Sequence, residues 1–491
     1  MMNIKKIAFA LAALSVSTLA SAGITPAQIE SARGAGTLDQ AWIAGASAPT
    51  RSIYEGWVKG CQAGTGSIFT AQAASNTSTA PGSLGNFFAY ACTRGTRTSV
   101  LYHTVDGGSL NAFTPFTNGT KLARVSYFGG TSTSCAKQAT GYVDTSNTAN
   151  NADLYKGCAQ SGSPVALDAN GVQTSANRAI NAAALTADAL APQQIVGGFS
   201  DVEPALFSAA IGGGNVSSFG TVSNAFLGQA FGVAVSNPLY RRLQQVQGIS
   251  ESGNNFTPAL APSLTRSQIA SILADGGAVQ TAESWFPILG EEDGEKVIIQ
   301  RRVDTSGTQA SSNAFFLGNP CLGGSSLLPA ATTSGNYQVV LNSGSGNVKT
   351  NITTASNAAA GSRYAIGVLS LENDPTLENA ANRDYHYIKI DGSHPETGDV
   401  VNARLAAASG LYPFHMEAKA FVANTAPAGF QRTIVTTIVN ALKNPTSAAC
   451  ATLPRGLTLN PDGGNTSCVA GVVKAKFTNF GNNCAPAVLF E

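Results

Sequence analysis

The chain has 491 residues, of which 43% are hydrophobic and 12% are charged, and its formal net charge is +1. This hydrophobic content is enough for packed cores, and the length predicts two or three domains at roughly 100–200 residues each. A nearly neutral chain without a basic tract lacks the electrostatic field that nucleic-acid binding uses, so no nucleic-acid partner is expected.

Residues 1–22 have the pattern of a secretory signal peptide. Lys5 and Lys6 precede a largely apolar run over residues 7–20, and Ala20-Ser21-Ala22 is a cleavage site of the A-x-A type. The run is too short for a membrane anchor, and no later stretch approaches the roughly 20 apolar residues that a membrane helix needs. We therefore expect an exported protein that does not span the membrane, and the sequence leaves open whether it is periplasmic or secreted.

The eight cysteines suit an exported chain. Their number is even, and they show neither a C-x-x-C pair nor a zinc-ligand spacing, so up to four disulfides and no metal site are expected. Pairing cysteines that are close in sequence predicts Cys61–Cys92, Cys135–Cys158 and Cys468–Cys484, and leaves Cys321 and Cys450 over. Other pairings stay open at this point.

Strand-like and helix-like segments alternate along the chain. Loops rich in Gly, Ser, Thr and Asn separate them at 60–85, 131–151 and 331–360. Such strand–helix units predict an α/β architecture. The expected elements are a strand at Ala41–Ala44, a helix at Ile53–Val58, strands at Val100–His103, Ile195–Ser200 and Val297–Ile299, and a helix at Gln309–Phe316.

The turn Arg301–Thr308, between the last of these strands and the last helix, predicts an anion site. The first N–H groups of a helix lack intrahelical partners and carry partial positive charge, and Gly307 lets the backbone approach a ligand. Ser306 and Thr308 supply hydroxyl donors, and Arg302 supplies a planar guanidinium. A capped helix with a surface arginine pair explains the same residues, and this turn alone leaves both interpretations open.

Four other turns place small residues beside a strand or helix. Each alone is an ordinary loop, because Gly, Ser and Asp are common turn formers. They are Gly45–Thr50, Asp106–Asn111, Ile195–Pro204 and Gly410–Phe414. Together with Arg301–Thr308, which we call the arginine turn, these segments resemble in order and residue sequence the exported phosphate-binding proteins of ABC-type phosphate uptake, a branch of the type II periplasmic-binding fold.

In that family a GAGAT-like turn, a GSSGG-like turn, an S-D pair, an RxDGSGT segment and a G-x-Y-P turn occur in this order. The S-D pair is Ser200-Asp201 here, and the arginine turn fits with Thr305 in place of the usual Gly. Ser109 matches the first Ser of the second motif, whereas Leu110-Asn111 departs from it. The first motif is interrupted, so Thr50 is placed only approximately.

The resemblance implies a two-lobed α/β fold with a ligand cleft between the lobes. Leu264–Leu273 is similar to the family's helix before the arginine turn, and Tyr364–Val368 to the strand that returns to lobe one. The chain would cross between the lobes near Phe231–Val235 and near Ser370–Glu372. The implied parts are lobe one at 23–230 plus 373–491, with insertions at about 59–97 and 112–192, and lobe two at 231–372.

The resemblance also implies a ligand. Hydrogen phosphate would be held without covalent chemistry and delivered to an ABC permease, and no catalytic residue, cofactor or metal is implied. Arg302 would balance the ligand's charge, with Asp304 close enough in sequence to orient it. The expected ligand-binding residues are Thr50, Ser109, Asp201, Arg302, Ser306, Gly307 and Thr308.

Asp201 would set the choice between anions. A carboxylate beside a bound anion repels it unless the anion carries a proton to donate, which hydrogen phosphate does near neutral pH and sulfate does not. An unpaired buried acceptor costs about 1–3 kcal/mol, so the wrong ligand is penalised. A salt bridge to Arg302, or a helix cap before Val202-Glu203-Pro204, is the structural alternative for Asp201.

Two alternatives to a solute-binding function are an enzyme and a scaffold. The chain has no G-x-S-x-G elbow, no H-E-x-x-H and no Walker G-K-[ST], and its four histidines lack metal-ligand spacing, so no enzyme is predicted. A secreted or surface scaffold for adhesion, which keeps the binding fold with weak or no phosphate affinity, stays open because of the long polar loops.

Overall fold

The structure is a computed structural model. It describes residues 23–119, 122, 124–129, 135–144, 147–161, 195–250, 256–274, 285–290, 295, 297–323, 331, 337–373, 375, 384–395, 410–443, 457–459, 476–479, 482–486 and 488–490. The predicted signal peptide, Cys450 and Cys468 lie outside these residues. Among the helices described, none is both long and apolar enough to cross a membrane.

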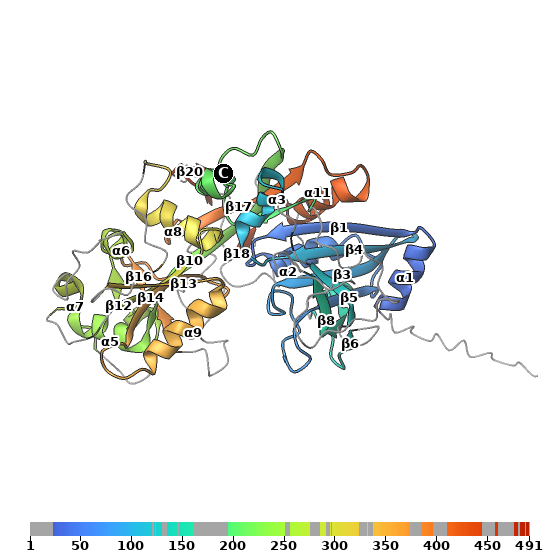
Figure 1. Cartoon of the computed structure of the whole chain (residues 1–491). Coiled ribbons are helices and arrows are strands. Elements are labelled where there is room, and N and C mark those ends of the chain that lie inside the picture. The colour runs from blue at the N-terminus through green and yellow to red at the C-terminus, as the bar shows by residue number, and fades with distance from the viewer. Residues whose placement is uncertain are drawn as a thin grey trace, which may run out of the picture.

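The fold is mixed α/β, built on one large mixed sheet (Figure 1). Fourteen strands of the described residues join it, in the spatial order β13-β12-β14-β10-β17-β9-β1-β4-β3-β2-β7-β6, with β15 and β18 also paired to β10. Their bounds are β1 Leu38–Gly45, β2 Gly66–Thr70, β3 Phe87–Arg94, β4 Arg97–Thr104, β6 Ala136–Lys137, β7 Ala152–Lys156, β9 Gly197–Ser200, β10 Gly220–Ser236, β12 Val297–Arg302, β13 Tyr337–Asn342, β14 Tyr364–Ser370, β15 Tyr385–Tyr387, β17 His415–Ala423 and β18 Leu457–Leu459.

Helices and short strand pairs surround this sheet. The helices are α1 Pro26–Gly34, α2 Thr50–Val58, α3 Thr114–Thr117, α5 Asn237–Val246, α6 Arg266–Leu273, α7 Phe286–Leu289, α8 Gly307–Leu317, α9 Ser345–Ser356 and α11 Phe430–Lys443. The separate pairs are β5 Arg124–Gly129 with β8 Cys158–Ser161, β11 Ser263–Leu264 with β16 Lys389–Ile390, and β19 Lys476–Thr478 with β20 Val488–Phe490.

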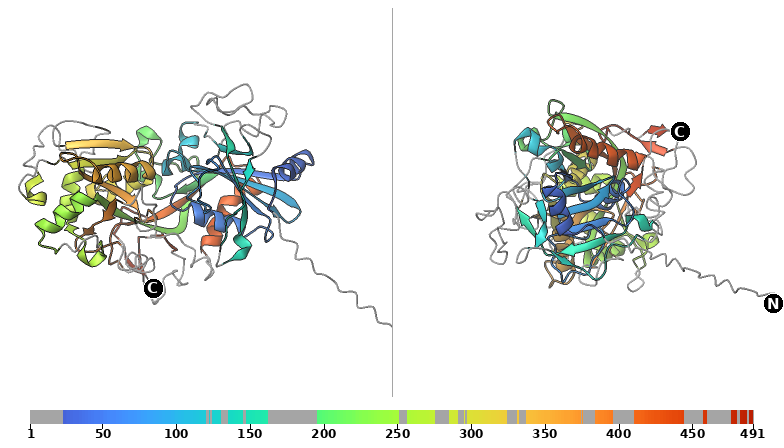
Figure 2. Two further views of the ribbon diagram at one scale, coloured as in Figure 1. Left: turned by 90° about the horizontal axis from the view of Figure 1, so that it is seen from below. Right: turned by 90° about the vertical axis from the view of Figure 1, so that its right-hand side faces the viewer.

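The elements gather at the two ends of the long strand β10 (Figures 1 and 2). We call β1–β4, β7, β9, α1, α2 and α11 the β1 group, and β12–β14, α5, α6, α8 and α9 the β12 group. The first part of β10, Gly220–Ala230, pairs with β17, and the last part pairs with β14 and β15. Strand β10 therefore runs from one group into the other.

The sequence explains why these elements form. The last part of β10, Phe231–Val235, is buried throughout, as expected of a strand covered on both faces. In the β12 group, β12 pairs in parallel with β13 and β14; α8 connects β12 to β13, and α9 crosses from β13 to β14 on the other side of β12. Helix α6 begins at a capping box, in which the Thr265 hydroxyl accepts from the Gln268 backbone N–H and the Gln268 side chain accepts from the Thr265 backbone N–H. The strands and helices expected from the sequence are all present.

The chain returns to the β1 group later than Glu372. Strand β15 pairs with Ala234–Ser236 of β10, and β16 pairs with β11, so Tyr385–Ile390 lies with the β12 group. The sequence had assigned these residues to lobe one. The physical reason is that the edge of β10 opposite β14 is open beyond the end of its pairing with β17 at Ala230, and a short strand from the next segment fills it.

The predicted insertion at 59–97 is part of the sheet. Strand β3 pairs antiparallel with β4 over eight residue pairs, and β2 continues from β3 toward β7. Phe88 and Tyr90 of β3 pack with Trp57 of α2 in the main hydrophobic core. The segment therefore extends the sheet and supplies core residues rather than lying outside it.

Two of the three predicted disulfides are present and the third is wrong. Cys61 bonds Cys92, and Cys135 bonds Cys158. Cys484 bonds Cys321, across 163 residues, instead of its sequence neighbour Cys468. Proximity in sequence failed here because the C-terminal segment packs beside the end of α8, which only the tertiary fold brings near.

Candidate anion-binding site

Ser109, Asp201 and Gly307 meet where the two groups of elements touch. Ser109 opens the 3-10 turn Ser109–Ala112 after β4, Asp201 follows β9, and Gly307 is the first residue of α8. The Ser109 hydroxyl donates to Asp201 Oδ2 at 2.9 Å. A methyl group at Gly307 would lie 2.3 Å from Ser109 Oγ and 2.4 Å from Asp201 Oδ2. Only glycine therefore allows the start of α8 to approach this pair.

Backbone contacts hold the same junction. The Leu110 N–H of the β1 group donates to Thr305 O of the arginine turn at 3.1 Å. Gly108, with a φ of +84°, lies so close that a methyl group there would be 3.0 Å from Thr305 O. The turn after β4 and the turn after β12 are thus packed against each other, and both lead into helical turns at the junction.

Arg302 is the cation of this site. It ends β12, and its side chain donates from Nη1 to Ser345 Oγ at 2.8 Å and from Nη2 to Ser343 O at 3.1 Å. Its Nε is buried and has no hydrogen-bond partner among the described residues. Burial lowers the pKa of Arg302 to about 10, against the opposing charges of Asp201 and Glu372. The guanidinium is therefore still positively charged at neutral pH.

Asp304 does not orient Arg302, contrary to the sequence prediction. Its carboxylate pairs with the guanidinium of the neighbouring Arg301 instead. Arg301 and Arg302 are successive residues of β12, so their side chains point to opposite faces of the sheet. Asp304 is mostly exposed on the Arg301 side. The residues that position Arg302 come from the start of α9.

Asp201 is a buried carboxyl that accepts a hydrogen bond. Burial raises its pKa to about 6, although the Ser109 hydrogen bond and the charge of Arg302 lower it. It does not cap the following 3-10 turn, whose N-cap residue is Glu203 without a side-chain capping bond. The capping alternative is therefore excluded, while the electrostatic attraction to Arg302 is present.

Of the seven expected ligand-binding residues, all are buried. Those not yet described, Ser306, Thr308 and Thr50, differ in whether they lie at the junction. Ser306 is the N-cap residue of α8 without a side-chain capping bond, and Thr308 lines a small cavity with Arg302 and Gln309. Thr50 begins α2, where its hydroxyl donates to Ser47 O at 2.6 Å. Among the described contacts, none joins Thr50 to Asp201 or Gly307.

The sequence missed Ser345 and Glu372. Ser345 follows β13 in the turn Ser343-Gly344-Ser345, which repeats the strand, Gly/Ser turn and helix pattern of the arginine turn. Because β13 lies parallel beside β12, the two turns meet at the same edge of the sheet. Recognition of that second pattern within the polar loop 331–360 would have found Ser345. No local signal marks Glu372.

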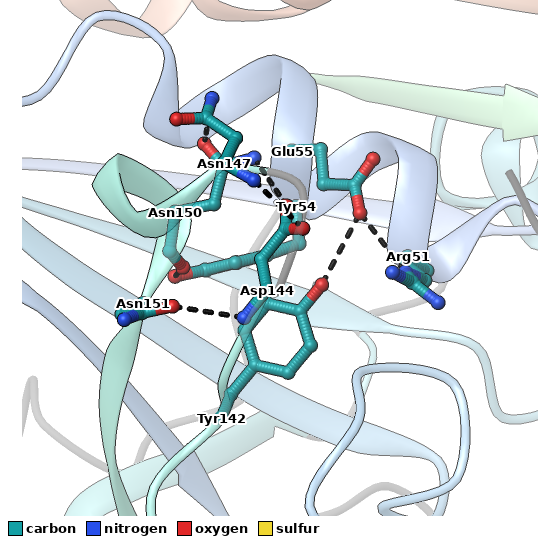
Figure 3. A network of polar contacts seen from close by, with 8 residues as sticks. All are labelled: Arg51, Tyr54, Glu55, Tyr142, Asp144, Asn147, Asn150 and Asn151. Carbon is teal, nitrogen blue, oxygen red and sulfur yellow. Dashed lines mark hydrogen bonds and ion pairs between the residues drawn. The ribbon is translucent and has the colours of Figure 1, made fainter. Parts of the chain in front are cut away.

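A second buried polar cluster lies under α2 (Figure 3). Arg51 pairs with Glu55 at 2.9 Å, and the Tyr142 hydroxyl donates to the same carboxylate at 3.2 Å. Asp144 accepts from the Asn147 N–H at 3.1 Å and from Asn150 Nδ2 at 2.8 Å. We call these residues, with Tyr54 and Asn151, the α2 cluster. Its buried side-chain atoms all have hydrogen-bond partners, which indicates a structural role.

No protein-family model and no curated protein matches the chain. Among solved structures, it is similar to one from Clostridium perfringens, described as a candidate phosphate ABC transporter substrate-binding protein with bound phosphate. The two sequences are 16% identical, the match covers 48% of this chain and 70% of that chain, and the TM-score is 0.29. A likeness of this size decides neither family nor ligand, so both rest on the residues of this chain.

Proposed function

We propose that the protein is an exported solute-binding protein that holds inorganic phosphate, as hydrogen phosphate, between two lobes formed by the β1 and β12 groups. The meeting of Ser109 and Asp201 from one group with the start of α8 from the other carries this proposal. A glycine-lined helix start, a buried guanidinium and a buried carboxyl lie at one junction. These are the groups that a protonated tetrahedral anion requires.

The ligand's contacts follow from the free groups at the junction. Arg302 Nε has a hydrogen to donate, and the first N–H groups of α8 lie beside Gly307. Ser109 and Ser306 can turn their hydroxyls toward an anion, and Asp201 can accept the ligand's proton. Thr308 would add a hydroxyl from the first turn of α8. Thr50 is given no direct contact with the ligand in this proposal. It lies near the ends of β1 and β9, where the Ala46 N–H donates to Phe199 O at 2.7 Å.

Binding would be coupled to lobe movement and not to covalent chemistry. Strand β10 joins the two groups, so a bend along it would open and close the junction. Closure around an anion would bring the Ser109–Asp201 pair against α8, which is the arrangement seen here. An ABC permease is the partner that this function implies, and no catalytic step is proposed.

Calorimetric titration of refolded protein with phosphate, arsenate and sulfate tests the function. Refolding removes any anion carried through purification. We expect phosphate and arsenate to bind and sulfate to bind much more weakly, because sulfate has no proton for Asp201. Binding of sulfate as tightly as phosphate, or of none of the three, would contradict the proposal.

One observation favours a scaffold as the second candidate. The 482–486 segment is bonded to the end of α8 through Cys484–Cys321 and to the β1 side through Asn483, whose N–H donates to Glu203 Oε1 at 2.8 Å. This covalent link restrains the movement that uptake needs. A scaffold function predicts that the midpoint of thermal unfolding is unchanged by phosphate, whereas a binding protein gains stability with ligand concentration.

A further inference from the structure

The carboxyl group of Glu372 has a buried oxygen, and Glu372 is not among the seven ligand residues that the sequence predicts. It follows β14 by two residues, at the point where β14 has finished pairing with β10. The Ser370 hydroxyl donates to its Oε1 at 2.6 Å. Its Oε2 is buried and accepts no hydrogen bond from the described residues. The carboxyl is therefore held from one side, with its second oxygen open.

The support behind Glu372 is well ordered by hydrogen bonds. Asn373 Nδ2 donates to Ser370 O at 3.0 Å, and the Tyr387 hydroxyl donates to Ser370 O at 3.2 Å and to Asn373 O at 2.7 Å. These contacts fix the turn Ser370–Asn373 against β15. The open oxygen of Glu372 is thus positioned by its own segment and does not depend on a flexible loop.

Charged groups from three other elements act on Glu372. They are Arg302 at the end of β12, Asp201 after β9 and Lys349 in α9. Burial, together with the charge of Asp201, raises the pKa of Glu372 to about 7, against the Ser370 hydrogen bond and the charge of Lys349, which lower it. Glu372 in turn raises the pKa of Arg302. Two carboxyls and one guanidinium therefore share this junction.

The two unpaired atoms indicate which groups a ligand must supply. Arg302 Nε needs a hydrogen-bond acceptor and Glu372 Oε2 needs a donor, because a buried polar atom without a hydrogen bond has lost its hydration and gained nothing in exchange. Hydrogen phosphate has one proton, and the proposed function directs it to Asp201. If the open oxygen of Glu372 lies beside the same anion, a second proton is required.

We propose that Glu372 is a specificity-determining residue of this site, which makes the protein bind its oxyanion together with one additional proton shared between Glu372 Oε2 and a ligand oxygen. The inference rests on the proposed function and deepens it. The complex is dihydrogen phosphate facing two carboxylates or, with the same proton count, hydrogen phosphate facing a protonated Glu372. Fully deprotonated oxyanions are excluded by the same repulsion.

Calorimetric titration with phosphate from about pH 7 to about pH 9, in buffers of different ionisation enthalpy, tests the inference. In the wild type, proton uptake per phosphate should rise from near zero at about pH 7 to one at about pH 9, and the affinity should fall about tenfold per pH unit at the upper end of this range. Glu372→Gln should take up no proton and show a nearly flat profile, because its amide donates to hydrogen phosphate directly. At the upper end of the range the variant should bind more tightly than the wild type.

Two variants serve as matched controls. Glu203→Gln makes the same change at a neighbouring carboxyl whose oxygens accept from Asn483, so the wild-type slope should remain. Glu372→Asp keeps a proton site and should keep a slope. Proton uptake that is unchanged in Glu372→Gln overturns the inference alone. Absence of phosphate binding at every pH overturns the proposed function and this inference together.

A measurement without ligand separates the two failures further. Because the pKa of Glu372 is raised on folding, the folded state holds its proton to higher pH than the unfolded state. This makes the free energy of unfolding fall as pH rises through about 7. Glu372→Gln should flatten that fall. An identical fall in both proteins would show that Glu372 is not in the buried environment that the inference needs.

Discussion

The α2 cluster and the junction of the β1 and β12 groups differ in how completely their buried polar atoms are paired. In the α2 cluster the carboxylates of Glu55 and Asp144 each accept two hydrogen bonds from neighbouring residues (Figure 3). At the junction of the β1 and β12 groups, Arg302 Nε and Glu372 Oε2 are buried without a partner. Under the proposed function, a ligand at the junction would supply the partners that these two atoms lack.

Their positions in the fold explain the difference. The α2 cluster joins α2 to residues 142–144 and 147–151, and both belong to the side of the sheet formed by the β1 group. The junction brings together segments from both groups, at positions 109, 201, 302 and 372. Polar pairs within one group form on folding and persist in the native state. Under the proposed function, polar groups at the junction of two groups that move apart are left for a ligand to bridge.

The largest expected effect is on Arg302. Arg302→Ala should weaken phosphate binding by about a thousandfold, or about 4 kcal/mol, because it removes the cation from a site that keeps a buried carboxyl. Isothermal titration measures the loss. Arg51→Ala, which removes the arginine of the α2 cluster, is the matched control and should leave affinity unchanged. If both variants bind phosphate like the wild type, the junction is not the site.

The link between the groups can be cut at Cys321–Cys484. Replacing both cysteines by serine should cost roughly 3 kcal/mol of unfolding free energy and should speed phosphate release, since the groups then separate more easily. Denaturant unfolding and stopped-flow release measure the two effects. The double serine variant of Cys61–Cys92, a disulfide within the β1 group, should lose stability only. Equal release rates in both variants would show that the long-range disulfide does not restrain the junction.

The α2 cluster should matter for stability alone. Asp144→Ala leaves the Asn147 N–H and the Asn150 amide without their acceptor, and should lower the unfolding free energy by about 2 kcal/mol. Phosphate affinity, measured below the unfolding transition, should be unchanged. A parallel loss of affinity would mean that the two clusters are coupled and that their contrast is misleading.

Asp201→Asn should have the smallest and most selective effect. The amide can accept as the carboxylate does, but it can also donate, so sulfate no longer meets an unpaired charge. We expect the ratio of phosphate to sulfate affinity to fall roughly tenfold, or about 1.4 kcal/mol, with a smaller change in phosphate affinity itself. Competition titrations with the two anions measure the ratio. An unchanged ratio would assign Asp201 a structural role only.

Local sequence patterns predicted most elements around the junction. The apolar run before Arg301, the Gly/Ser/Thr turn and the start of α8 follow one another as expected, because strand and helix periodicity are local properties. The two shorter disulfides were also found by proximity. Patterns could not find the return of β15 to β10, which depends on an edge that exists only in the folded sheet.

Within the site, residue types were predictable and partners were not. Arg302 and Asp201 were expected from their motifs, and the structure brings Asp201 to Ser109 and Gly307. Asp304, three residues from Arg301 and two from Arg302, pairs with Arg301 because alternate residues of a strand face opposite ways. Thr50 was placed from the weakest motif, and the described contacts do not connect it to the junction.

The sequence by itself determined the mixed α/β pattern and the Gly307 turn at the start of α8, and it named Arg302 and Asp201 as candidates for an anion site. These depend on side-chain spacing and backbone freedom within a few residues. Only the tertiary structure decided that Ser345 holds Arg302, that Cys321 bonds Cys484 and that Glu372 joins Asp201 at the junction. Each of these brings together residues far apart in the chain. Ser345 reaches Arg302 because β13 lies parallel beside β12, and the other two encounters depend on how β10 connects the two groups.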